Sequence, residues 1–210
     1  MDPKKIRTAR DLLDALDQRG RGDEAESFDQ AVWKQLGTEG TVLVTDLSGF
    51  TRLTRNHGIL HFLQIFRRCE NVCLPLIAAY GGTLLKEEAD DLIGLFASPT
   101  KALECAAAML EGLAEVNATL AEEEHIGLCI GIDHGRFIRL DDDAFGDPVN
   151  TAFKLGEDVA DRDEILIAAD AFARAKTSGY DFSRFVVDGP RERETGSIVV
   201  PHYALRLRKG

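Results

Sequence analysis

Two aspartates, far apart in the chain, stand at the ends of predicted strands. Asp46 ends the strand-like run 41–46, and Asp90 lies in a short turn between the strand-like runs 83–88 and 92–97. If these strands are neighbours in a sheet, both carboxylates lie at one edge. Such oxygen donors suit Mg²⁺, which completes its shell with water and phosphate oxygens. Two ions astride a phosphate can activate an attacking hydroxyl and stabilise the leaving group.

The segment after Asp46 could hold that phosphate. It contains Gly49, Phe50 and Thr51, and it offers small residues and free backbone amides at the predicted start of a helix. Each aspartate also has a purely structural explanation. An aspartate before a helix is usually a cap, and an aspartate in a hairpin usually serves the turn. Taken one residue at a time, the structural explanation is favoured.

The elements that must position these residues alternate along the main body. The pattern predicts a strand at 41–46, a helix at 61–80, strands at 83–88 and 92–97, a helix at 99–120, a strand pair at 126–133 and 136–140 that turns at His134 and Gly135, a helix at 148–160, a strand at 164–169, a short helix at 170–176 and a closing strand pair. This order predicts an α+β fold. Its core is a ferredoxin-like βαββαβ unit with additional αβ and β-hairpin elements, and its helices lie on one side of a mixed sheet.

Composition and charge limit the possible classes of protein. The 210 residues are 44% apolar and 29% charged, which is typical of one globular domain, and residues 1–40 read as an N-terminal helical extension of a main domain at 41–210. The net charge of −11 argues against non-specific binding of nucleic acid. Neither a membrane span nor a secretory signal is recognisable, so we expect a cytoplasmic location.

Four cysteines are scattered through the chain. Cys69 and Cys73 share a helical face and could bind a metal ion together with His61. Buried free thiols are the favoured interpretation, because such cysteines behave as small apolar side chains.

Four separated motifs together resemble the catalytic domain of class III adenylate/guanylate cyclases. They are VTDLSGFTRLT at 44–54, AAYGGTLLKEEADDLIGLFASP at 78–99, CIGIDHG at 129–135 and FGDPVNTAFKLGE at 145–157. The similarity runs from about residue 41 to residue 170 and covers most of the main body. Because several motifs match in order and spacing, the resemblance implies the fold of that family.

The resemblance assigns Asp46 and Asp90 to two Mg²⁺ or Mn²⁺ ions per site. In that family the ions bind the triphosphate and help to deprotonate the ribose 3′-hydroxyl, which attacks the α-phosphorus. Pyrophosphate leaves, and a cyclic 3′,5′-monophosphate remains. Asp91 is then expected to point the other way across the pleat.

The choice of base falls, by the same resemblance, on Lys86 and Asp143. A lysine and an aspartate at these positions favour adenine, because a cationic donor and a carboxylate acceptor complement its ring nitrogens and its amino group. The implied substrate is ATP. The structural alternatives are an exposed strand lysine paired with Glu87 or Glu88, and one more acid in the loop 141–143.

Two further positions match residues that act on the ribose and on the transition state. Asn150 matches the asparagine that orients the ribose, and Lys154 stands where the family usually has an arginine. Lysine keeps the charge but lacks the planar fork of a guanidinium. The chain also has Ala89 for a usual glycine and Glu87-Glu88 for an apolar pair. These departures leave two functions open: an adenylate cyclase of low activity, or a catalytically degenerate domain that binds nucleotide and regulates a partner.

The resemblance also implies a second copy of the chain. In that family one subunit supplies the metal-binding aspartates, and the other supplies the base-selecting residues, the asparagine and the following cation. A head-to-tail homodimer with two composite sites is therefore expected.

Overall fold

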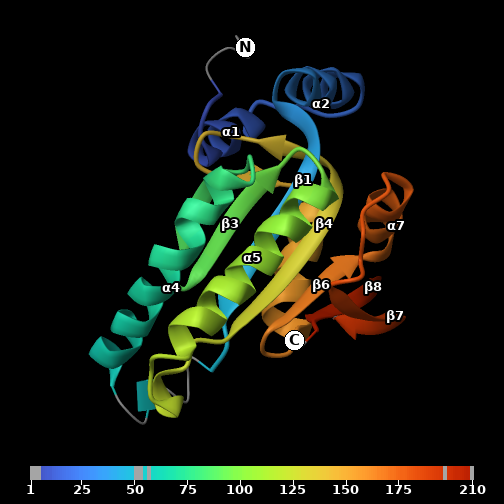
Figure 1. Cartoon of the computed structure of the whole chain (residues 1–210). Coiled ribbons are helices and arrows are strands. Elements are labelled where there is room, and N and C mark those ends of the chain that lie inside the picture. Colours follow the sequence, from blue (N-terminus) through green and yellow to red (C-terminus); the bar gives the residue numbers. More distant parts are fainter. Residues whose placement is uncertain (1–5, 50–53, 56–57, 196–197, 209–210) are drawn as a thin grey trace.

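The chain folds around one mixed sheet, with strand order β2-β3-β1-β4-β6-β8-β7 and β5 paired to β4 (Figure 1). The computed structural model describes residues 6–49, 54–55, 58–195 and 198–208. The strands are β1 (Gly37–Leu47), β2 (Thr83–Glu88), β3 (Asp91–Phe96), β4 (Leu128–Arg139), β5 (Ala144–Phe145), β6 (Glu164–Ala168), β7 (Phe185–Thr195) and β8 (Ile198–Leu207). Among the pairings between them, only that of β4 with β6 is parallel.

The helices are α1 (Ala9–Leu16), α2 (Asp23–Leu36), α4 (Ile59–Ala79), α5 (Pro99–Asn117), α6 (Asp147–Phe153) and α7 (Ala169–Thr177), with a short 3₁₀ turn at Glu122–Glu124. Strands β1 to β4 with α4 and α5 form the predicted βαββαβ core, so the predicted fold class is confirmed. The proposed division at residue 40 stays a prediction; β1 begins at Gly37, directly where α2 ends. Among the described helices, none combines the length and the apolar character that a membrane-spanning segment needs.

The predicted strand pair at 126–133 and 136–140 is wrong, because one long strand, β4, occupies this region. Every residue of β1 pairs with β4 in an unbroken register from Gly37–Ile138 to Leu47–Leu128. His134 lies in the middle of that register, where its Nδ1 is 2.8 Å from Thr41 Oγ1. A His-Gly pair looks like a turn in the sequence, but the long partner strand keeps this backbone extended.

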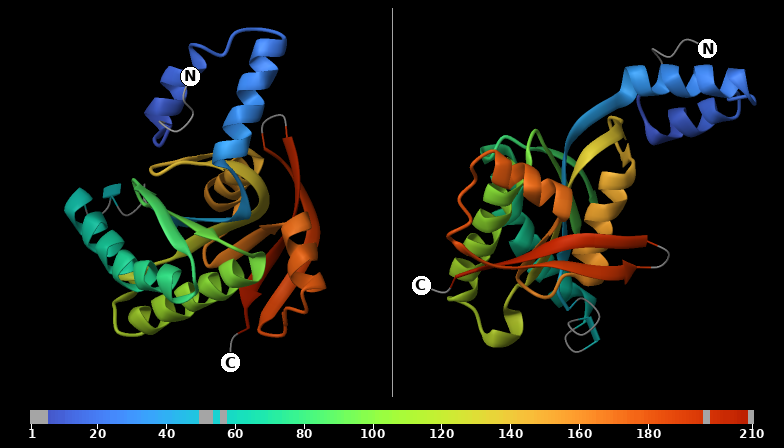
Figure 2. Two further views of the ribbon diagram at one scale, coloured as in Figure 1. Left: turned by 90° about the horizontal axis from the view of Figure 1, so that it is seen from above. Right: turned by 90° about the vertical axis from the view of Figure 1, so that its right-hand side faces the viewer.

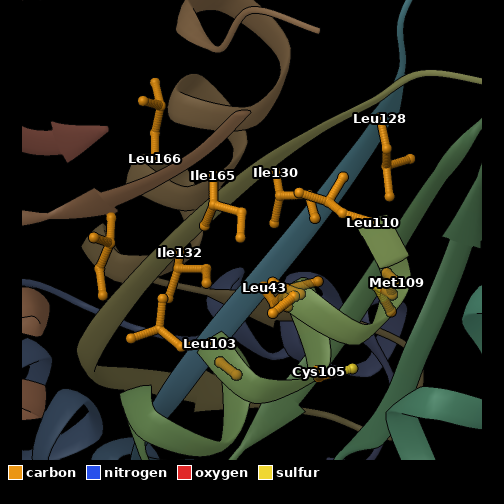
Figure 3. Packing of buried hydrophobic residues seen from close by; sticks show 14 of the residues in the cluster. Leu43, Leu103, Cys105, Met109, Leu110, Leu128, Ile130, Ile132, Ile165 and Leu166 are labelled. Atoms are coloured by element: carbon orange, nitrogen blue, oxygen red, sulfur yellow. The ribbon is translucent and has the colours of Figure 1, made fainter. Parts of the chain in front are cut away.

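Helices cover both faces of the sheet, which corrects the expectation of helices on one side (Figure 2). On one face, α4 and α5 bury the large core, in which Leu43 and Ile130 of the sheet meet Leu103 and Met109 of α5 (Figure 3). On the other face, the smaller α6 covers a second cluster of buried residues, which comprises Val42, Val44, Ile93, Leu95, Phe137, Ala144, Val149 and Ala152. The alternation along β1, with Leu43 on one face and its neighbours on the other, explains why a central strand is apolar throughout.

The predicted helix at 148–160 is α6 followed by a π-helical turn, Lys154–Val159. The turn lies very close to β4. A Cβ on Gly131 would be 2.0 Å from the carbonyl oxygen of Ala152 and 2.5 Å from the amide nitrogen of Gly156, so only glycine fits there. Wide turns of this kind often occur at functional sites. Here the turn brings both Lys154 and Glu157 to the sheet.

Candidate active site

The strand register brings Asp46 and Asp91 together. The pairing of β1 with β3 runs to Thr45–Leu92, and the next step along both strands places Asp46 opposite Asp91. Asp91 follows the tight turn that carries Asp90, where Ala89 has a φ of 53°. The predicted meeting of two strand ends therefore occurs, with three aspartates at this end of the sheet.

Burial and neighbouring charges both affect the ionisation of these carboxylates. Burial, followed by the negative charges of Asp90 and Glu157, raises the pKa of Asp46 to about 7. Burial, followed by the charges of Glu157 and Asp46, raises the pKa of Asp91 to about 8. Each group resists ionisation because it is buried and because its neighbours are acids. We call Asp46, Asp90, Asp91 and Glu157 the carboxylate cluster.

The expectation that Asp91 points away from the site is wrong. Asp91 shares a sheet face with Ile93 and Leu95, and that face is the one on which Asp46 and the π-helical turn lie. Sequence reasoning began β3 one residue late and so assigned Asp91 to the turn. The alternation of Asp91, Ile93 and Leu95 was the signal that could have placed it correctly. No pattern in the sequence pointed to Glu157, because its place depends on the π-helical turn.

The donor set of the carboxylate cluster fits a divalent cation. The Oδ1 atom of Asp91 is buried, and among the described residues it has no hydrogen-bond partner. Within the described part of the chain, no three His, Cys, Asp or Glu side chains are arranged to hold a metal ion by themselves. Carboxylate oxygens are nevertheless the donors that Mg²⁺ prefers, and this ion commonly takes one or two ligands from protein and the rest from phosphate and water.

The cysteines belong to the apolar interior. The Sγ atoms of Cys69 and Cys73 lie 3.7 Å apart in the core, and all four cysteines are buried free thiols, as predicted.

A second group of predicted residues meets elsewhere on the same chain. Nζ of Lys86, on β2, lies 3.1 Å from Oδ1 of Asp143 and 2.7 Å from Oε2 of Glu88. The same Oδ1 of Asp143 accepts a hydrogen bond from the backbone N–H of Ala144 (2.8 Å). Lys86 therefore pairs with a neighbour on its own strand, as the structural alternative predicted, and also with Asp143. The role of the two residues in base selection stays a prediction.

Asn150 and Lys154 form a third group on α6 and the π-helical turn. Both line a hollow of about 650 Å³ between α6, the end of β6 and β8. Asp133 of β4 also lines it, and burial raises the pKa of Asp133 to about 6. The lining includes neither the carboxylate cluster nor the pair of Lys86 and Asp143. One chain thus presents three separate groups of candidate residues.

The predicted phosphate cradle is described only at its start. Gly49 lies in the turn after β1 with a φ of 94°, a left-handed conformation that favours glycine. Phe50 and Thr51, the other residues predicted there, lie outside the described residues.

Comparisons with known proteins agree with the motifs. The chain is 34% identical over 128 residues to "Putative adenylate cyclase 3" of Rhizobium meliloti (strain 1021), 26% identical over 125 residues to "Serine/threonine-protein kinase pkn2" of Myxococcus xanthus, and 30% identical over 146 residues to "Adenylate cyclase" of Streptomyces coelicolor. These matches span 60%, 60% and 70% of this chain but only 22%, 15% and 34% of the relatives. No family model matches the chain.

Solved structures share the fold. The guanylyl cyclase Cya2 matches with a TM-score of 0.67 at 19% identity, over 82% of this chain and 94% of that one. The adenylyl cyclase CyaB from P. aeruginosa matches with a TM-score of 0.67 at 18% identity, over 82% and 97%. The resemblance to the class III adenylate/guanylate cyclase catalytic domain is therefore confirmed.

Proposed function

We propose that this chain is a nucleotide cyclase that converts ATP to 3′,5′-cyclic AMP and pyrophosphate at the interface of a head-to-tail homodimer. The observation that carries the proposal is the convergence of Asp46 and Asp90, whose charges are close enough to shift a pKa. The similarity to proteins named adenylate cyclase supports it. We place the reaction in the cytoplasm, where ATP is abundant.

In this proposal Asp46 and Asp90 hold two Mg²⁺ or Mn²⁺ ions. When bound, such ions would supply charge for the triphosphate and lower the pKa of the ribose 3′-hydroxyl. The buried Oδ1 of Asp91 and the raised pKa of Asp46 support this assignment, because a cation relieves the repulsion among these acids. Backbone amides after β1, starting near Gly49, would bind phosphate oxygens.

Lys86 and Asp143 would select the base. A lysine ammonium donates to a ring nitrogen of adenine, and a carboxylate accepts from its amino group. The 3.1 Å contact between the two side chains supports a shared role, since it holds donor and acceptor side by side. Guanine presents the opposite hydrogen-bonding pattern at its 6-position, so this pair favours ATP.

Asn150 and Lys154 would act on the reacting end of the nucleotide. The Asn150 amide orients the ribose, and the Lys154 ammonium stabilises the negative charge that develops as the bond between the α-phosphorus and the pyrophosphate oxygen breaks. Both side chains border one hollow, so a single ligand could contact both.

Two copies of the chain would be needed for one site. The hollow beside Asn150 and Lys154 includes no residue of the carboxylate cluster. The three groups of residues would act on one nucleotide only if a second subunit supplied some of them. A symmetric head-to-tail dimer brings the metal-binding groups of one copy to the base-selecting groups of the other, twice.

The alternative function is a catalytically degenerate domain that binds nucleotide and regulates a partner. Its specific support is the contact between Lys86 and Glu88, at 2.7 Å, which competes with the base for the lysine. In their ionised forms, the extra acids Asp91 and Glu157 would repel a triphosphate bound beside them. Lys154 lacks the fork of an arginine.

The deciding experiment incubates the purified full chain with ATP or GTP and with Mg²⁺ or Mn²⁺, followed by chromatography of the nucleotides. We expect cyclic AMP from ATP, and none from the Asp46→Ala or Asp90→Ala variants. The absence of product with either metal, together with measurable ATP binding, would establish the binding domain instead. The absence of both product and binding would exclude both functions.

A further inference from the structure

The N-terminal segment 6–9 lies against the loop 140–143, which carries Asp143 (Figure 1). The backbone N–H of Asp141 donates to the carbonyl oxygen of Arg7 (2.7 Å), and the backbone N–H of Ala9 donates to Oδ1 of Asp142 (2.8 Å). The Arg7 guanidinium also contacts Asp141 Oδ2 at 2.7 Å. Three successive contacts therefore tie the start of α1 to a loop more than 130 residues later in the chain.

An apolar contact anchors the same two segments. Leu140, which follows β4 directly, is 4% exposed and packs in a small cluster with Ile6, Leu12, Ala15 and Val32. This cluster lies apart from the two cores of the sheet, and its other buried members all come from the N-terminal extension. Burial of Leu140 therefore depends on the extension, because the rest of the domain offers it no other buried apolar partner in the described structure.

The same loop also contacts the proposed base-selecting pair, so the extension helps to fix the position of Asp143. The backbone N–H of Leu140 donates to the carbonyl oxygen of Asp143 (2.9 Å), which closes the loop tightly. At its far end, Asp143 contacts Lys86. The three acids of the loop thus have three different partners: Asp141 contacts Arg7, Asp142 contacts Ala9, and Asp143 contacts Lys86.

We propose that the N-terminal extension positions Asp143, with Ile6 and Asp142 as positioning residues, and so sets how well the domain binds the adenine base. That the ligand is adenine rests on the proposed function. The coupling between the extension and the loop 140–143 rests only on the contacts described above. A movement of α1 would shift the loop and weaken base binding without touching the carboxylate cluster. The extension thereby becomes the part of the chain through which a partner can control substrate affinity.

The contacts between the extension and the loop 140–143 differ in how much they stabilise this arrangement. The Arg7 and Asp141 side chains are 75% and 57% exposed, and an ion pair this open contributes little. The burial of Ile6 against Leu140 and the hydrogen bond from Ala9 to Asp142 therefore carry the coupling. Ile6→Ala removes the first, and Asp142→Ala removes the second. Asp142→Asn should restore function, because its amide oxygen accepts the same hydrogen bond without the charge.

The test measures amide hydrogen exchange and ATP kinetics on the full chain. In Ile6→Ala and Asp142→Ala we expect faster exchange in the peptide that covers 140–144, with unchanged exchange in β1. We also expect a KM for ATP about five-fold higher, as the loss of one hydrogen bond implies, with kcat within about two-fold. Asp14→Ala is the matched control, because Asp14 pairs with Arg10 on α1 and does not contact the loop.

Unchanged exchange at 140–144 and unchanged KM in both variants would overturn the coupling, and so would a fall in kcat at constant KM. A wild-type chain that makes no cyclic nucleotide would show that the proposed catalysis is wrong. It would not contradict the coupling between the extension and the loop 140–143. In that case the dissociation constant for ATP replaces KM. The coupling then stands if Ile6→Ala and Asp142→Ala weaken ATP binding and speed exchange of the loop, and it falls if they do neither.

Discussion

Lys86 and Asp143 lie 57 positions apart in the chain, and their side chains are 3.1 Å apart in the structure. In the sheet, β2 and β4 are separated by β3 and β1, so the loop after β4 folds back over the sheet to reach Lys86. Within the acidic run 141–143, the structure shows a contact with the lysine for the third acid, which supports the proposed assignment of Asp143. From the sequence alone, an error of one residue in this run would have gone unnoticed.

If this pair selects the base, its exchange should change the substrate. We predict that Lys86→Glu with Asp143→Cys shifts preference from ATP towards GTP, because a carboxylate accepts from the ring N–H and amino group of guanine. The ratio of kcat/KM for the two nucleotides measures the shift, and we expect it to change by at least about ten-fold, or about 1.4 kcal/mol. Lys86→Glu with Asp141→Cys is the control. A folded double variant that still prefers ATP would show that other residues read the base.

If each active site is formed by two chains, a mixture of two inactive variants should regain activity. We expect Asp46→Ala and Lys154→Ala each to abolish most activity, since each removes one group from both sites of a homodimer. Mixing the two variants should restore up to about one quarter of wild-type activity, because half of the dimers are mixed and each has one intact site of two. Product formation after mixing, with heterodimers counted by native mass spectrometry, is the measurement. Heterodimers that form without regaining activity would mean that each chain holds a complete site.

Much of the fold could be predicted from the sequence because the local signals agree with the tertiary structure. The runs at 83–88 and 99–120 have clear periodicity and clear starts, such as Ser98-Pro99, and the structure places β2 at Thr83–Glu88 and α5 at Pro99–Asn117. The error at His134 arose because a turn-forming pair sits inside a strand. Its extended conformation is imposed by pairing with β1, which is far away in the chain. Local propensity does not reveal that a segment will pair with a distant strand.

In the candidate site, too, some positions follow from local sequence signals and others depend on contacts between distant elements. Asp46 and Asp90 could be predicted because strand ends converge in a βαββ unit. Glu157 could not, because a π-helical turn carries it, and that turn depends on the close approach of Gly131 and Gly156. The contact between α1 and the loop 140–143 also had no signal in the sequence, since acids in a loop are ordinary on a surface. Contacts that depend on packing between distant elements need the structure.

The side chain at position 154 allows a test of the departure from the usual arginine. We predict that Lys154→Arg raises kcat about five-fold while the KM for ATP changes little, because a guanidinium adds a second hydrogen bond to the same charge in the transition state. Steady-state rates with ATP and Mn²⁺ provide the measurement. Lys101→Arg, an exposed position on α5, is the control. A lower kcat in a well-folded Lys154→Arg variant would indicate that the π-helical turn has been adapted to lysine.

The carboxylate cluster predicts how stability depends on pH in the absence of metal. Asp91 has a pKa near 8 in the folded chain, because of burial and of the charges of Glu157 and Asp46, against 3.8 as its ordinary value. Its contribution to stability is therefore fully present below pH 3.8 and is lost as the pH rises through about 8.

In EDTA, the wild-type melting temperature should fall between pH 6 and pH 9. Asp91→Asn should melt higher than wild type at both pH values, and its advantage should be about 2–4 °C larger at pH 9 than at pH 6, whereas the exposed Asp17→Asn should not change the melting temperature at either pH. Mn²⁺ should stabilise the wild type more at pH 9 than at pH 6, because protons compete with the ion for the same oxygens. Thermal unfolding followed by circular dichroism measures all of these, and a wild-type melting temperature that stays constant from pH 6 to pH 9 in EDTA would contradict the close approach of these acids.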